Sequence, residues 1–299
     1  MDTSIERTAN VTQATSSARA APRGSFRQRI TPHLLPAFTT LAIVYLMIPI
    51  AVMIIFSFNL PVGKFNYQWN QFSLEGWLHP FDWPGLPDSV ATSLEVAVLS
   101  TIFATIMGTM IGLALTRYQF RGRGAINAII FLPMATPEIV LGASMLTLFV
   151  ATALPPLQGK VPTLYPTGFT TILIAHILFN ISFVVVTVKA RLAGFDRRLE
   201  EAAMDLGANE LVTFWKVTFP LILPGILAAA LLAFSLSIDD FVITNFVSGT
   251  TNTFPIWIYG VIRNALPVQI NVIGSMIFIG AVVLVGLSSY RSGRAARIR

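Results

Sequence analysis

The sequence contains, at residues 221–246, the stretch Leu221-Ile-Leu-Pro-Gly-Ile-Leu-Ala-Ala-Ala-Leu-Leu-Ala-Phe-Ser-Leu-Ser-Ile-Asp-Asp-Phe-Val-Ile-Thr-Asn-Phe246. Its only charged residues are the two adjacent aspartates near its end. A helix needs about 20 mostly apolar residues to cross the hydrocarbon core of a bilayer. Lipid offers no hydrogen-bond partners, so a segment of this length must satisfy its own backbone groups as a helix. The stretch therefore predicts a transmembrane helix.

Similar apolar blocks occur along most of the chain. Hydrophobic residues make up 54% of the 299 residues and charged residues 11%, whereas a soluble domain carries about 25% charged residues. Together with residues 221–246, these blocks predict an all-α membrane protein with six transmembrane helices. The other five blocks are Leu34–Phe58, Val90–Thr116, Ile126–Thr152, Phe169–Val188 and Val268–Leu287.

The distribution of lysine and arginine predicts the orientation. With the N-terminus inside, seventeen of the 20 basic residues lie in inside segments, and only Lys64, Lys160 and Arg263 lie outside. This asymmetry follows the positive-inside rule, so we expect both termini in the cytoplasm and no nucleic-acid partner. The predicted organisation is a disordered cytoplasmic tail (1–33), a six-helix transmembrane domain (34–290) and a basic cytoplasmic tail (291–299).

The inside loop 189–219 has a helical pattern of its own. Within residues 197–206, the small and apolar residues recur at helical spacing, and charged residues cover the other faces. Gly207 follows this short helix, and Asn209 is placed to cap a second one. Two interpretations remain open, namely a hairpin lying on lipid and a docking site for another protein. The apolar positions are Leu199, Ala202, Ala203 and Leu206.

One motif in this loop carries a family resemblance. Glu201-Ala202-Ala203, three residues, Gly207, nine residues and Val217-Thr-Phe-Pro220 resemble the EAA signature of permeases in binding-protein-dependent ATP-binding-cassette (ABC) importers. The resemblance implies that the loop couples the permease to an ATPase. It implies that Glu201 lies near the subunit contact, that Ala202 and Ala203 allow close helix packing, and that Gly207 makes the turn.

The same resemblance implies the remaining components. The sequence has no Gly-x4-Gly-Lys-Ser/Thr phosphate loop, so we expect a transport subunit rather than an enzyme, with ATP used by a separate partner and neither cofactor nor metal on this chain. The expected partners are a second permease subunit, two ATPase subunits, an extracytoplasmic solute-binding protein and membrane lipid. The expected location is the bacterial cytoplasmic membrane.

Acidic residues in the apolar blocks suggest the solute. Charged groups are costly inside a membrane and usually face a cavity or a partner, and no lysine or arginine lies well inside a predicted span. An unpaired acidic lining suits a cationic solute. Glu138 follows Pro137 and is placed either to cap a restarting half-helix or to line the pathway. Asp239 and Asp240 are placed to pair with Arg263, to cap backbone groups or to line the pathway.

Three further segments, Leu132–Gly142, Ser237–Gly249 and Thr253–Tyr259, resemble spermidine/putrescine-type permeases, specifically their second membrane subunit. That branch also includes permeases for opines and other small solutes. Within the last segment, Trp257 and Tyr259 are candidates for stacking on an ammonium group, although anchoring at the membrane interface is the more common role of such residues. An ion-coupled secondary carrier and a non-transporting scaffold are the alternative functions. The three histidines, His33, His79 and His176, are too dispersed to suggest a site.

Overall fold

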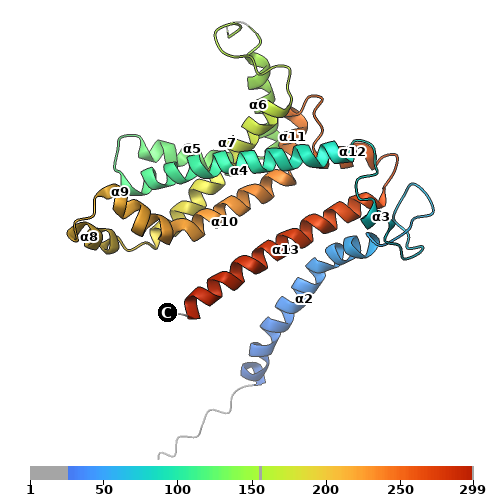
Figure 1. Cartoon of the computed structure of the whole chain (residues 1–299), viewed down its shortest axis with the longest axis horizontal. Coiled ribbons are helices and arrows are strands. Elements are labelled where there is room, and N and C mark those ends of the chain that lie inside the picture. The colour runs from blue at the N-terminus through green and yellow to red at the C-terminus, as the bar shows by residue number, and fades with distance from the viewer. Residues whose placement is uncertain (1–25, 155–156, 298–299) are drawn as a thin grey trace, which may run out of the picture. The chain divides into compact units, whose positions relative to one another are not determined.

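The computed structural model describes residues 26–154 and 157–297. Within them the regular structure is helical, apart from two isolated β-bridges, so the all-α class is confirmed (Figure 1). The chain divides into two units, residues 1–55 and 56–299. The elements are α2 (Phe26–Phe56), α3 (Glu75–Leu78), α4 (Leu86–Arg117), α5 (Arg123–Ala135), α6 (Glu138–Ala151), α7 (Phe169–Ala193), α8 (Arg198–Asp205), α9 (Glu210–Thr213), the π-helical turn η1 (Phe214–Thr218), α10 (Phe219–Ile238), α11 (Val242–Val247), α12 (Phe254–Val261) and α13 (Val268–Arg297).

The described residues contain four helices that are long and apolar enough to cross a membrane, in α2, α4, α7 and the run from α9 to α10. A fifth span results if α5 and α6 are counted together, and the apolar part of α13, Val268–Val283, is shorter. Most of the predicted apolar blocks are therefore helices. Four to five candidate spans are present by length and composition.

Two predicted spans are interrupted. The block Ile126–Thr152 breaks between α5 and α6, which meet at 110°. Pro137 lacks an N–H and disfavours helical geometry in the preceding residue, and Thr136 is accordingly extended at φ −86° and ψ 134°. The block 221–246 also proved wrong as one helix, because α10 ends at Ile238 and α11 begins separately at Val242.

The first and last helices of the chain extend beyond the boundaries predicted for them. Helix α2 begins at Phe26, inside the stretch 1–33 assigned to a disordered tail, and α13 continues to Arg297, through most of the predicted basic tail. Once nucleated, a helix propagates readily through arginine, alanine and glutamine. Residues 1–25 and 298–299 lie outside the described part of the chain, so the remainder of the predicted tails does too.

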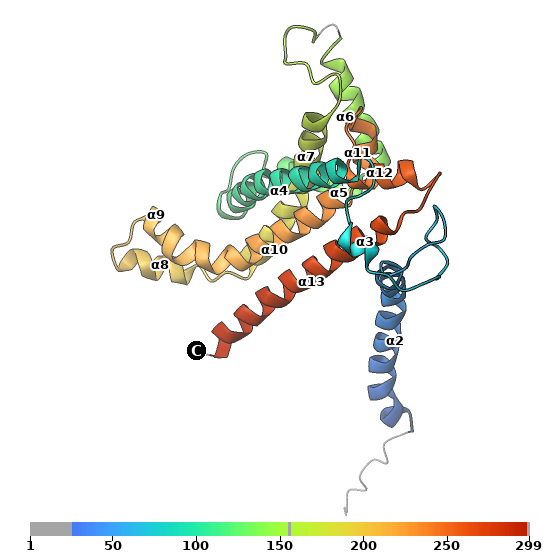
Figure 2. The same cartoon turned by 45° about the vertical axis from the view of Figure 1, so that its right-hand side comes forward.

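Helices α4, α7 and α10 pack against one another through small residues (Figures 1 and 2). A Cβ atom added to Gly108 of α4 would lie 2.6 Å from Val184 Cγ1 of α7, and one added to Gly112 would lie 3.3 Å from Val188 Cγ1. The two contacts advance in the same direction, so α4 and α7 run parallel. Close approach at glycine is the usual way for membrane helices to gain van der Waals contact. The buried cluster comprises Ala104, Val184, Val188, Leu192, Ile222, Ile226, Ala229 and Ala233.

We expect Gly108→Val to lower the thermal stability of the purified protein in detergent. The new side chain would have to push α4 away from α7, and overpacking of this kind costs about 1–3 kcal/mol. Gly280→Val in α13 is the matched control, since a Cβ there meets nothing within 4 Å. Equal melting temperatures for the two variants would contradict the close packing of α4 on α7.

A second buried cluster joins α6, α7 and α11. Phe149 of α6, Ile172 and Phe179 of α7, and Ile243 and Val247 of α11 are its main members. Gly142 gives the ring of Phe246 room, because a Cβ at that glycine would lie 2.6 Å from Phe246 Cδ2. This packing sets the position of the short helix α11, and with it the turn that joins α10 to α11.

Candidate functional site

A helical elbow precedes α10. We use this name for residues 196–218, which comprise α8, Gly207, α9 and η1. Gly207 has φ +87°, a left-handed conformation that favours glycine, and it turns the chain between α8 and α9. The Asn209 side chain accepts a hydrogen bond from the backbone N–H of Val212 at 2.9 Å. The predicted pair of short helices, with a glycine corner and an asparagine cap, is therefore confirmed.

The apolar face of α8 does not contact the core of the chain. No residue of α8 is buried, and Leu206, which follows it, is 91% exposed. Ala202 and Glu201 are also exposed, whereas Ala203 is half-buried. An amphipathic helix normally covers its apolar stripe against another surface. Within the described residues that stripe is uncovered, so the elbow presents an apolar surface with charged residues around it.

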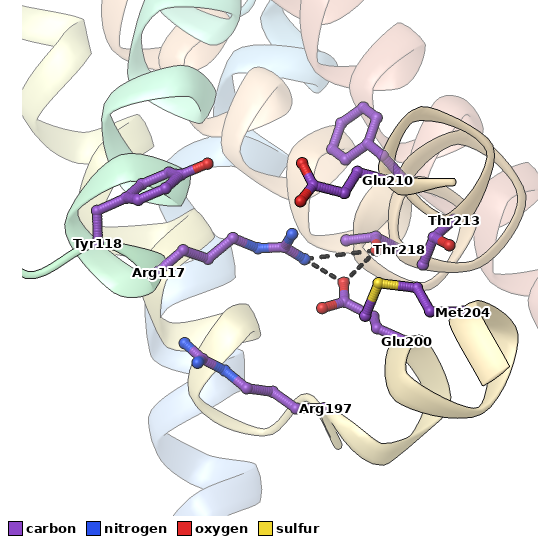
Figure 3. A pocket seen from close by; sticks show the side chains of 9 residues that line it. Arg117, Tyr118, Arg197, Glu200, Met204, Glu210, Thr213 and Thr218 are labelled. Atoms are coloured by element: carbon purple, nitrogen blue, oxygen red, sulfur yellow. Dashed lines mark hydrogen bonds and ion pairs between the residues drawn. The ribbon is translucent and has the colours of Figure 1, made fainter. Parts of the chain in front are cut away.

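Glu200, rather than Glu201, connects the elbow to the helical bundle (Figure 3). Its carboxylate forms an ion pair with Arg117, the last residue of α4, and accepts a hydrogen bond from the hydroxyl of Thr218 in η1. Arg197 donates a further hydrogen bond to the backbone oxygen of Thr116 at 3.2 Å. No local pattern predicts this contact, because Arg117 and Glu200 lie far apart in the chain. The end of α4 and the start of the elbow are thus held together.

A polar corner lies at the other end of α10. We use this name for residues 237–244, which join α10 to α11. Asp240 Oδ2 accepts hydrogen bonds from the backbone N–H of Thr244 at 2.8 Å and from its hydroxyl at 2.6 Å. The Asp240 side chain is only 8% exposed, whereas Asp239 is exposed. The two adjacent carboxylates therefore occupy different environments, with Asp240 capping α11 and Asp239 open.

His176 of α7 completes the polar corner, although its isolation in the sequence had suggested no site. Its Nδ1 lies 2.6 Å from Ser237 Oγ, and its Nε2 lies 2.8 Å from Thr244 Oγ1. Ser237 is in turn 2.9 Å from Ser100 Oγ of α4. The His176 side chain is 3% exposed. Four helices, α4, α7, α10 and α11, are thereby joined by one buried hydrogen-bonded chain.

Glu138 is the first residue of α6, directly after the break at Pro137. Capping of a restarting half-helix was one of the two roles predicted for it, and a helix does restart at this position. The Glu138 side chain is exposed and forms no hydrogen bond or ion pair within the described residues. A carboxylate at a helix N-terminus is stabilised by the helix dipole.

The two aromatic candidates, Trp257 and Tyr259, differ in how far their side chains are exposed. Trp257 is 7% exposed, packs in a cluster with Leu86 and Phe254, and donates from Nε1 to the backbone oxygen of Pro84 at 3.0 Å. Its ring is occupied by the core, which leaves no face open to a solute. Tyr259 is 48% exposed and lies 4.9 Å from the Phe241 ring, centroid to centroid.

Arg263 was considered as a partner for the paired aspartates, but it contacts Tyr259 instead. Its guanidinium carbon lies 4.8 Å from the centroid of the Tyr259 ring, and Nη2 donates to the Tyr259 hydroxyl at 2.7 Å. No ion pair forms between Arg263 and either Asp239 or Asp240 within the described part of the chain. The negative charge of Asp239 is therefore uncompensated by this arginine.

Comparison with known proteins agrees with the helical bundle and its elbow. Residues 104–295 match the family model described as binding-protein-dependent transport system inner membrane component. The chain belongs to this family. Members of the binding-protein-dependent inner membrane components are transport subunits, and the ATPase is a separate chain, so this protein is not an enzyme.

Two curated members of the family are similar over most of their length. The spermidine/putrescine transport system permease protein PotC of Escherichia coli K12 is 35% identical over 249 residues, which cover 83% of this chain and 89% of PotC. The putrescine transport system permease protein PotI of the same strain is 35% identical over 262 residues, covering 87% and 90%. These relatives are ABC transporter permeases, and this chain is homologous to them.

A solved structure supports the fold of this binding-protein-dependent component. A bacterial ABC transporter involved in the import of the acidic polysaccharide alginate has a chain with TM-score 0.68 to this one. The match covers 90% of this chain and 97% of that chain at 17% sequence identity. At that identity the likeness concerns the fold alone.

Proposed function

We propose that this chain is one of two permease subunits of an ABC importer for polyamines such as spermidine and putrescine. The observation that carries the proposal is the exposed carboxylate of Asp239, which forms no ion pair within the described residues, at a corner where its neighbour Asp240 is used as a cap. A polyamine is a small cation, and exposed carboxylates attract it. The names of the curated relatives give the same solute class.

The proposed pathway residues are Asp239, Glu138 and Tyr259. Asp239 and Glu138 supply negative charge, and both are exposed. Tyr259 has a half-exposed ring whose face carries the Arg263 guanidinium, so an ammonium group of the solute would take the place of Arg263 there. Asp240 is not among these pathway residues, because it caps α11, and Trp257 is not among them, because it is buried in the core.

The proposed topology has six spans. Helices α2, α4, α7, α10 and α13 supply five, and α5 with α6 supplies the broken sixth. Both termini lie in the cytoplasm of a bacterium, with the chain in the cytoplasmic membrane. This arrangement follows the positive-inside distribution of the sequence. It places the elbow on the cytoplasmic face, where two ATPase subunits act, and the polar corner toward the outer half of the membrane.

The proposed mechanism is alternating access between two permease subunits. A solute-binding protein delivers the polyamine from outside, and closure of the ATPase pair moves the elbow. The uncovered apolar face of α8 and the adjoining Leu206 are the surface that the ATPase covers. The ion pair of Glu200 with Arg117 then carries that movement into α4.

Reconstitution tests this proposal. We expect liposomes that contain this chain, its partner permease and the ATPase to accumulate radiolabelled putrescine or spermidine when the binding protein is outside and ATP is inside. Unlabelled polyamines should compete, and a zwitterionic opine should not. A protonophore added while ATP is maintained should leave uptake unchanged. Uptake that collapses with the protonophore would indicate an ion-coupled carrier, and competition by the opine alone would remove the polyamine assignment.

A further inference from the structure

The hydrogen-bonded chain through His176 has a fixed direction at one end. Thr244 has a single hydroxyl hydrogen, which it donates to Asp240 Oδ2 at 2.6 Å. Its oxygen must therefore accept from His176, so Nε2 carries a hydrogen in the 2.8 Å contact. Asp240 receives two hydrogen bonds from Thr244, and Thr244 is held by His176. The histidine thus fixes the residue that fixes the carboxylate.

At the other end of the hydrogen-bonded chain, the hydrogen bonds can be arranged in more than one way. Ser237 lies 2.6 Å from His176 Nδ1 and 2.9 Å from Ser100 Oγ, and its hydroxyl can donate to either. Ser100 has an alternative acceptor in the backbone oxygen of Ala97, at 3.3 Å. Loss of Ser100 would therefore leave the bond from Ser237 to His176 intact. Asp240 depends on His176 in two ways: through Thr244, and through a direct contact of 3.4 Å between His176 Nε2 and Asp240 Oδ2.

The short helix α11 cannot hold its own position. It spans only Val242–Val247, and an isolated helix of that length is unstable. In addition to the packing of Ile243 and Val247 in the core, its first turn is held by Asp240, which accepts the Thr244 N–H at 2.8 Å and lies 3.4 Å from the Ile243 N–H. Thr244 is fully buried, and without His176 its hydroxyl oxygen would lose a donor while the hydroxyl still donates to Asp240. The polar chain is therefore complete only with a donor at position 176.

We propose that His176 is a positioning residue for solute recognition, which acts by holding Asp240 on α11 so that Asp239 alone faces the cationic solute. This inference rests on the proposed function. In the structure the corner then presents one open negative charge in place of two. A solute that approaches the corner meets a single, fixed carboxylate. The hydrogen bonds from His176 through Thr244 to Asp240 determine that this carboxylate is Asp239.

The test uses the complete importer with four variants of this chain. His176→Leu removes the donor at similar size, and His176→Gln restores it, because the glutamine amide can donate to Thr244 and accept from Ser237. Thr244→Val removes the hydroxyl with little change of volume and serves if His176→Leu fails to fold. Ser100→Ala is the matched control, since it deletes a buried polar group of the same core without breaking the His176–Thr244–Asp240 part.

Two readouts are needed. Backbone hydrogen exchange of residues 241–247 in the assembled complex reports the position of α11 without reference to transport. We expect His176→Leu and Thr244→Val each to raise this exchange about tenfold, as loss of a buried hydrogen bond predicts. Uptake kinetics should show the KM for putrescine raised about tenfold, with the maximal rate nearly unchanged. His176→Gln and Ser100→Ala should behave like the parent protein in both readouts.

Three results would overturn the inference. Unchanged exchange at 241–247 in His176→Leu would remove the positioning role, and so would raised exchange with an unaltered KM. An equal change of KM in Ser100→Ala would show that general damage to the core is responsible. Asp239→Asn separates this inference from the proposed function. Unaltered polyamine uptake in that variant removes the recognition role of Asp239, and an absence of polyamine uptake by the parent importer removes the proposed function. In either case the exchange measurement still decides whether His176 positions the corner.

Discussion

Replacing Gly207 with leucine is expected to lower ATP-driven uptake about a hundredfold, whereas the same change at Gly122 should leave uptake close to normal. Both glycines have a left-handed backbone, with φ +87° at Gly207 and +90° at Gly122, and a Cβ added at either meets nothing within 4 Å. The backbone cost of a side chain is therefore the same at both positions, about 1–2 kcal/mol. Only at Gly207 would the leucine project from the corner of the elbow into the surface proposed to dock the ATPase.

The comparison is made in the reconstituted importer. Uptake, ATP hydrolysis stimulated by the binding protein, and co-purification of the ATPase are measured for both variants, after insertion of each has been confirmed. The expected pattern is normal insertion with loss of ATPase binding or stimulation in Gly207→Leu alone. Equal loss in both variants would show that backbone strain is responsible, and full activity in Gly207→Leu would refute the role of the elbow in coupling.

Asp239→Asn is expected to reduce kcat/KM for putrescine by about 10- to 100-fold. The asparagine has the same shape and loses only the negative charge, which an ammonium group needs as a partner. The thermal stability of the purified protein should be unchanged, because Asp239 is exposed and the charge supports no ion pair within the described residues. Uptake by the complete importer over a range of putrescine concentrations measures the effect.

Asp240→Asn is the matched control, one residue away. The amide oxygen of asparagine can still accept the N–H and hydroxyl of Thr244, so kcat/KM should stay within about threefold of the parent value. Thermal stability should fall, because a charged acceptor in a buried site is replaced by a neutral one. If Asp240→Asn impaired uptake more than Asp239→Asn, the assignment of the open carboxylate would be reversed.

Some features of this protein follow from local sequence alone. The apolar blocks predicted most of the long helices, because the length of an apolar run is all that a bilayer requires of a span. Gly207 and Asn209 predicted the corner of the elbow, because a left-handed turn and a helix cap are each determined by one or two neighbouring residues. Pro137 likewise marked the start of α6.

The contacts that join distant segments could not be predicted from local sequence patterns. Glu200 pairs with Arg117 and His176 pairs with Ser237 and Thr244, and no local pattern announces a partner so far along the chain. The same limit explains Trp257, whose burial depends on Leu86 and Phe254. Asp239 and Asp240 are chemically identical, and only the turn from α10 into α11 decides which of them meets the N–H of Thr244.

Helix α4 is a long, straight connection between the elbow and the polar corner. It runs unbroken from Leu86 to Arg117, and its only proline is in the first turn, so at 1.5 Å per residue it is about 48 Å long. At one end of α4, Arg117 forms the ion pair with Glu200 of the elbow. Near the other end, Ser93 Oγ accepts a hydrogen bond from the backbone N–H of Phe254 at 2.8 Å. With no kink to absorb it, an axial displacement at Arg117 reaches Ser100 and Ser93 at nearly full amplitude. In the proposed mechanism, α4 would therefore carry a movement of the elbow to the neighbourhood of the polar corner.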